Sequence, residues 1–145
     1  MDPFPHRYVV DARCETSGPV DLRSEGAPDL VSAAPKEFGG PGDQWSPETL
    51  FVGAVVDCFL LSFRAVAAAS KLDWVGLRCR ATGTLDRVDR VTRFVAMEIA
   101  AELALPADGS IEKGERILEK AEQTCLVSNS LAVEVKLESR VTIEE

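Results

Sequence analysis

Hydrophobic residues are most concentrated between positions 46 and 70, where they cover nearly the whole circumference of a helix. The segment opens with the signals of a helix start, namely Ser46 as N-cap, Pro47 at the first helical position and the acidic Glu48. We expect one helix of roughly 23 residues, about 35 Å long. A helix that is apolar all round must be buried all round, and a small domain rarely wraps so long a helix alone. We therefore expect a partner subunit to cover part of it.

Alternation of apolar and polar residues predicts strands after this helix. The polar stretch 86–92 is expected to join two of them as a hairpin, and a further strand closes the chain. The inward positions of these strands are Val75, Leu77, Cys79, Ala81 and Leu85, then Val95, Met97, Ile99, Ala101, Leu103 and Leu105, and finally Val133, Val135, Leu137, Val141 and Ile143. On the last strand the outward positions are Glu134, Lys136, Glu138 and Arg140, which we interpret as a solvated face.

A second helix is expected between the hairpin and the last strand. Pro106 ends the preceding strand, and Asp108-Gly109-Ser110 opens the helix. Its apolar stripe consists of Ile111, Leu118, Ala121 and Cys125. Three short strands are predicted near the N-terminus, at residues 8–14, 20–24 and 30–33. Antiparallel strands interrupted by only two helices indicate an α+β fold rather than a doubly wound α/β fold.

Length and charge limit the function classes. A chain of 145 residues fits one domain, which we assign to residues 1–145 with residues 1–7 flexible. The net charge of -8 argues against a nucleic acid or an anionic membrane as partner. The N-terminus lacks the pattern of a secretory signal. Asp57 and Arg64 within the apolar run favour a buried helix over a membrane span, so we expect a cytoplasmic protein with reduced cysteines.

Four cysteines are the most reactive side chains of the chain. No Cys-x-x-Cys is present and the only histidine is His6, so the spacing does not predict a metal site. Cys58 and Cys125 each lie in an apolar, helical segment, where a cysteine often serves as a small buried hydrophobe. If the two thiols meet, they can instead form a redox pair. We expect Cys14 and Cys79 to be structural or incidental.

Two segments carry a resemblance to a known family. Residues 39–48 (GGPGDQWSPE), with Cys58 following, and residues 121–131 (AEQTCLVSNSL) are similar to the two motifs of OsmC and the organic hydroperoxide resistance protein Ohr. The resemblance covers about residues 30–145 with matching element order. It implies an intertwined homodimer in which two long central helices pack between curved, antiparallel-rich sheets.

The resemblance also implies a thiol-dependent peroxidase for small, apolar organic hydroperoxides. By position, Cys58 would attack the peroxide and form a sulfenic acid, and Cys125 would resolve it as a disulfide. No bound cofactor is implied; the reductant would be an external dithiol, such as a lipoyl group on a protein. Two alternatives on the same fold stay open, a non-catalytic dimer that binds an apolar ligand and a thiol redox sensor.

An activating cation is expected beside Cys58, because burial and the neighbouring Asp57 would otherwise raise its pKa. In the family an arginine held by the glutamate equivalent to Glu48 supplies this charge. The equivalent arginine position falls near Pro19 or Val20, so we take Arg23 as the candidate, with Arg13 and Arg64 as alternatives. Glu48 is also explained as an acid that complements the helix dipole. This departure, and Leu126 where many members have proline, suggest a divergent OsmC-like branch.

Overall fold

The computed structural model describes residues 1–145 and has the α+β architecture expected from the sequence. It divides into two compact units, Met1–Phe51 and Val52–Glu145, which are described separately. The single domain expected over residues 1–145 stays a prediction. The long helix α1 (Pro47–Ala69) begins in the first unit and continues through the second.

The first unit holds a three-stranded antiparallel sheet of β1 (Asp11–Cys14), β2 (Val20–Arg23) and β3 (Leu30–Ser32), in that order. All three strands fall within the expected segments, although β1 begins later than position 8. The register places Asp11 opposite Arg23 and Arg13 opposite Asp21. The arginine side chains form their ion pairs elsewhere, Arg23 with Asp29 and Arg13 with Glu15.

The helix start that the sequence predicts is built by two reciprocal hydrogen bonds. The Thr49 amide donates to the Ser46 hydroxyl at 3.1 Å, and the Ser46 amide donates to the Thr49 hydroxyl at 2.9 Å. The two side chains thus form a capping box in which threonine replaces the usual glutamate. Just before it, a short 3-10 turn, η1 (Lys36–Phe38), precedes Gly40, where a side chain would collide with the carbonyl oxygen of Ala34.

The second unit is built on a sheet of β4 (Gly76–Val88), β5 (Val91–Leu105) and β6 (Val135–Ile143). β4 and β5 are antiparallel, and β5 and β6 are parallel. The expected hairpin loop 86–92 is wrong, because the strands continue to a two-residue turn at Asp89 and Arg90. Their φ angles of 50° and 68° are those of a tight hairpin turn that matches the twist of the flanking strands.

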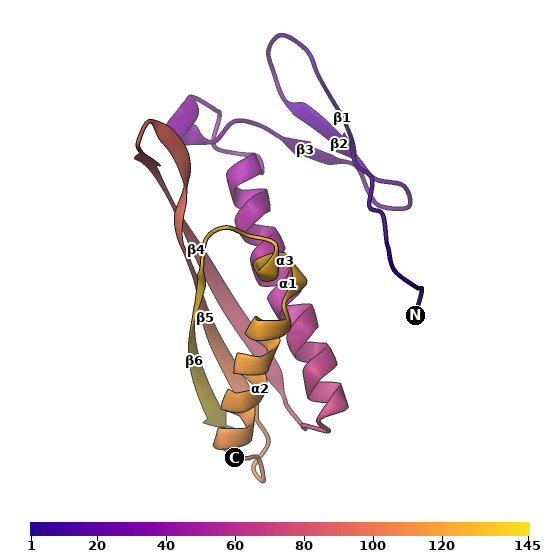
Figure 1. The fold of residues 1–145 in the computed structure, drawn as a ribbon, viewed down its shortest axis with the longest axis vertical. Helices are drawn as coiled ribbons and strands as arrows, with labels where there is room; N and C mark the ends of the chain where they lie inside the picture. The colour runs from indigo at the N-terminus through magenta and orange to yellow at the C-terminus, as the bar shows by residue number, and fades with distance from the viewer. The chain divides into compact units, whose positions relative to one another are not determined.

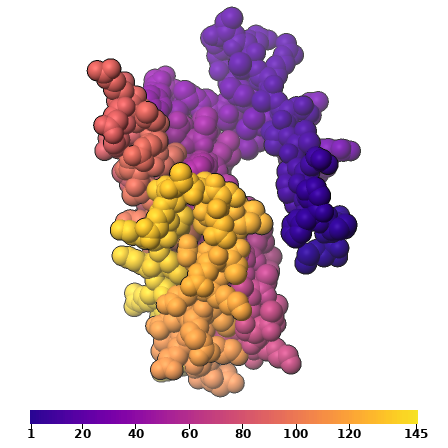
Figure 2. All heavy atoms as spheres, viewed as in Figure 1, coloured from indigo at the N-terminus to yellow at the C-terminus, as the bar shows by residue number.

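α2 (Ile111–Thr124) covers one face of this sheet (Figure 1). It forms part of the crossover that the parallel pair of β5 and β6 requires, and Ser110 caps it by accepting the Lys113 amide at 3.2 Å. The short α3 (Leu126–Asn129) follows. In the space-filling view the orange and yellow atoms of α2, α3 and β6 form one continuous surface (Figure 2). The buried residues of the sheet and of α2 include Met97, Ile99, Ala101, Leu103, Leu105, Gly114, Ile117, Leu118, Ala121 and Val135.

Within this one chain α1 is buried along one stripe, and the cover expected from a partner subunit stays a prediction. The stripe consists of Val55, Phe59, Phe63 and Ala67, and Phe63 packs edge-to-face on Trp74 at 5.2 Å between ring centroids. Leu61 is 53% exposed. α1 is the one helix long and apolar enough to cross a bilayer by length and composition alone, a test that the core helices of globular proteins also pass. Part of the apolar surface of α1, including Leu61, therefore has no cover within the chain.

Candidate active site

Cys58 and Cys125 come from different elements of the second unit. Cys58 lies in the middle of α1 and is half-buried, whereas Cys125 is fully buried. The sequence placed Cys125 inside the second helix, which is wrong: α2 ends at Thr124 and Cys125 is the junction residue before α3. Its extended backbone, with φ -65° and ψ 110°, interrupts the helical path and turns the chain.

The structure brings these two thiols into contact. Each thiol is close enough to shift the pKa of the other, and both are free cysteines. The hydroxyl of Ser62, one helical turn after Cys58, lies 3.9 Å from the Cys58 sulfur. The backbone N–H groups of Leu126 and Val127 reach the same sulfur from the first turn of α3. These two amides are available because the first N–H groups of a helix have no partner within it.

The surroundings of Cys58 lower its pKa from the ordinary value. Burial is the largest single influence and raises the pKa, but four donors together outweigh it. In order of effect they are the amide of Val127, the thiol of Cys125, the hydroxyl of Ser62 and the amide of Leu126. Each donor hydrogen-bonds the thiolate better than the thiol, so Cys58 is the more acidic member of the pair.

Cys125 is affected in the opposite sense, and its pKa is raised. Burial is the main cause, and the charge and hydrogen bond of Cys58 add to it. The hydroxyl and amide of Ser128 act against this rise, although the hydroxyl forms no hydrogen bond of regular geometry. The pair thus consists of a thiolate-prone Cys58 and a Cys125 that keeps its proton.

The other two cysteines lie apart from this chemistry. Cys79 is on β4, where burial raises its pKa to about 11, so it is protonated at neutral pH and a poor nucleophile. Cys14 is exposed on β1. No group of three or more His, Cys, Asp and Glu side chains in residues 1–145 could hold a metal ion.

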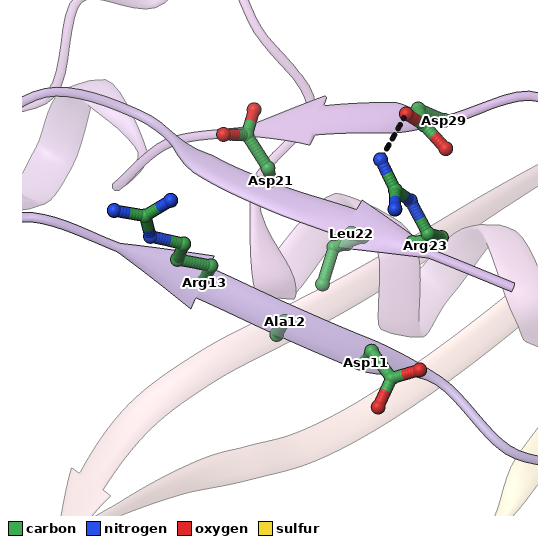
Figure 3. Close-up of a pocket in the computed structure, with 7 residues that line it drawn as sticks. All are labelled: Asp11, Ala12, Arg13, Asp21, Leu22, Arg23 and Asp29. Carbon is green, nitrogen blue, oxygen red and sulfur yellow. Dashed lines mark hydrogen bonds and ion pairs between the residues drawn. The ribbon is translucent and has the colours of Figure 1, made fainter.

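The remaining candidates belong to the first unit, apart from Arg64. Arg23 lies on β2 and forms an ion pair with Asp29 at 3.4 Å, beside a pocket of about 470 Å³ (Figure 3). Arg13 pairs with Glu15 at 3.9 Å. Glu48 has a buried carboxylate oxygen without a hydrogen-bond partner. Arg64 is exposed on α1 and is not among the groups that shift the pKa of Cys58.

Sequence reasoning missed the donors around Cys58. The position of Ser62 could have been predicted from the sequence, because a residue four positions after Cys58 lies on the same face of the helix. The amides of Leu126 and Val127 could not, because backbone N–H groups carry no sequence signature. They became available only because the second helix stops at Thr124.

Comparison with known proteins agrees with the fold and the two motifs. The family model described as OsmC-like protein matches residues 40–140. The uncharacterised protein YmaD of Bacillus subtilis (strain 168) is 25% identical over 114 residues, which are 75% of this chain and 76% of YmaD.

Solved structures of OsmC-like proteins also share the fold. An OsmC-like protein of unknown function from Vibrio cholerae has a TM-score of 0.86 at 16% identity, covering 94% of this chain and 100% of the other. An organic hydroperoxide resistance protein OsmC from Legionella pneumophila has a TM-score of 0.73 at 23% identity, covering 97% and 99%. With the family model matching most of its length, this chain belongs to the OsmC-like protein family.

Proposed function

We propose that this protein is a thiol-dependent peroxidase that reduces organic hydroperoxides, with Cys58 as the attacking thiol and Cys125 as the resolving thiol. The observation that carries the proposal is the asymmetry of the pair. A peroxidatic cysteine has to be a thiolate near neutral pH, and the pKa of Cys58 is lowered while that of Cys125 is raised. The peroxide-related role also fits a family in which relatives carry the name organic hydroperoxide resistance protein.

The proposed reaction has two steps on the protein. The Cys58 thiolate attacks one peroxide oxygen, so that an S–O bond forms, the O–O bond breaks and the alkoxide leaves as an alcohol after taking up a proton. The Cys125 sulfur then attacks the Cys58 sulfenic acid. An S–S bond forms, the S–O bond breaks, and the hydroxide leaves as water with the proton of the Cys125 thiol.

Apolar hydroperoxides are the substrate class that the surroundings of Cys58 favour. Leu61 lies one helical turn from Cys58 and is 53% exposed, and Leu126, whose amide reaches the sulfur, is 70% exposed. An alkyl group that covers these side chains removes apolar surface from water, and each buried methylene contributes roughly 0.8 kcal/mol. Hydrogen peroxide has no such group and gains nothing from this surface.

The partners are part of the same proposal. An external dithiol, such as a protein-bound lipoyl group, would return the disulfide to two thiols, and no bound cofactor takes part. A second copy of the chain would cover the exposed side of α1 in a cytoplasmic homodimer. The apolar residues of α1 outside its buried stripe support this arrangement. Two further roles stay predictions: Arg23 as the cation that assists Cys58, and Glu48 as the carboxylate that holds the arginine.

The test is consumption of cumene hydroperoxide with dithiothreitol as reductant. We expect turnover by the wild type and by Cys79→Ser, no turnover by Cys58→Ser, and a Cys58 sulfenic acid in Cys125→Ser that dimedone traps. Activity that survives Cys58→Ser rules out the proposed mechanism. Oxidation of Cys58 and Cys125 to one disulfide per chain, without turnover, would instead favour a thiol redox sensor.

A further inference from the structure

Ser62 is the only hydroxyl group of α1 beyond its first turn. It is half-buried and flanked by Leu61 and Phe63. A serine in a helix usually bonds the carbonyl oxygen four residues earlier, or points to water. Here the hydrogen bond of the hydroxyl goes to the side chain of the residue four positions earlier, the sulfur of Cys58, at 3.9 Å.

The direction of this bond depends on the state of the thiol. When Cys58 carries its proton, either the S–H or the O–H can be the donor. When Cys58 is a thiolate, its sulfur can only accept, so the Ser62 O–H must donate. A hydrogen bond to a charged acceptor is stronger than one between neutral groups. The contact therefore favours the thiolate, and it also fixes the sulfur on one side of α1.

We propose that Ser62 is a positioning residue for Cys58, holding the reactive sulfur by donating a hydrogen bond from its hydroxyl. This inference rests on the proposed function for its biological meaning, but the contact itself does not depend on peroxidase activity. The other titratable group at the sulfur is Cys125, and the nearest charged residues along α1, Asp57 and Arg64, are exposed. A neutral donor on the same helix thus performs part of the task expected of a cation.

The test compares Ser62→Ala, Ser62→Thr and the control Ser70→Ala, at the end of α1. The rate of Cys58 alkylation by iodoacetamide is followed from pH 5 to 10 by mass spectrometry of the Cys58 peptide, under reducing conditions. We expect Ser62→Ala to shift the midpoint to higher pH and to slow alkylation at pH 7 by about three- to tenfold. Ser62→Thr keeps the hydroxyl and should restore the wild-type profile, and Ser70→Ala should not change it.

A Ser62→Ala profile that superposes on the wild-type profile overturns the inference, as does a Ser62→Thr profile that matches Ser62→Ala. Alanine is a better helix former than serine, so loss of the fold is not the expected cause of either result. Failure of the proposed function looks different. If no hydroperoxide is consumed but Ser62→Ala still shifts the midpoint, Ser62 tunes a thiol with another role.

Discussion

The thiol of Cys125 lies close enough to Cys58 to lower its pKa as a hydrogen-bond donor, and this proximity moves the pKa values of the two thiols in opposite directions. Cys58 becomes more acidic because its thiolate is stabilised, and Cys125 becomes less acidic because its proton is shared. Such a pair titrates as a unit, with the first proton lost mainly from Cys58. The nucleophile and the resolving thiol are thereby distinguished before any substrate binds.

Replacing Cys125 by alanine or by serine separates its two roles. Both variants lose the resolving thiol, but serine keeps a donor beside Cys58. We expect Cys125→Ala to raise the pKa of Cys58 and to slow its alkylation at pH 7 by about threefold, and Cys125→Ser to stay closer to the wild type. Iodoacetamide labelling against pH measures this. Faster labelling of Cys58 in Cys125→Ala would contradict the donor role.

Leu126→Pro removes one donor with little other change. Leu126 is the first residue of α3, where proline is tolerated, and the extended backbone of Cys125 suits a residue before proline. The variant loses the N–H that lowers the pKa of Cys58, so we expect the alkylation midpoint to move to higher pH. Leu126→Ala keeps the N–H and is the matched control. Identical profiles for the two variants would exclude the amide as a donor.

The sequence predicted the sheet of the second unit well because one face of that sheet is covered. Met97, Ile99 and Leu103 alternate with Glu98 and other exposed residues. Burial that alternates with a period of two residues indicates a strand with one covered face. α1 was predicted equally well, because a capping serine followed by proline is a local signal. The helices and strands that the sequence predicted correctly are therefore those whose stabilising signals lie within their own residues.

The end of α2 could not be predicted in the same way. The spacing of Leu118, Ala121 and Cys125 continues a helical stripe, and no glycine or proline stands at the break. Cys125 leaves the helix and is fully buried at the junction, in contact with Cys58 on another element, which local propensity does not report. The donors at Cys58 depend on this break, so the sequence identified the two sulfurs but not their surroundings.

Cys79 should contribute to alkaline unfolding. Its folded pKa is raised to about 11 by burial, so above the ordinary pKa of about 8.5 the unfolded chain loses a proton that the folded chain retains. The stability that this thiol contributes is therefore complete below about pH 8.5 and is lost as the pH rises toward 11. The full shift would correspond to roughly 3 kcal/mol, but Cys79 is only half-buried and solvent screening weakens the effect, so we expect a loss of about 2 kcal/mol or less in the wild type.

Urea unfolding at pH 8 and pH 10.5, under reducing conditions, measures this contribution. Cys79→Ala should show a smaller loss of unfolding free energy between the two pH values than the wild type. Cys14→Ala, at an exposed position, is the control and should follow the wild type. Parallel losses in wild type and Cys79→Ala would show that other groups cause the alkaline transition.

Gly83 marks the place where the second unit tolerates no side chain on β4. A Cβ there would lie 2.7 Å from a methyl carbon of Val52 on α1 and 2.8 Å from the ring of Phe94 on β5. Either the helix or the ring must move to admit a methyl group. Overpacking of this kind typically costs about 1–3 kcal/mol, and we expect Gly83→Ala to lower the free energy of unfolding by that amount.

Gly76→Ala is the matched control, because Gly76 lies on the same strand and a Cβ there meets nothing within 4 Å. Alanine at an unstrained position restricts the unfolded chain, so this variant should be neutral or more stable by up to about 1 kcal/mol. Urea midpoints with unchanged m-values give the comparison. If both variants had the same stability, the close approach of Val52 to β4 would be excluded. If only Gly83→Ala is destabilised, the part of α1 that carries Cys58 is packed against the sheet through this glycine.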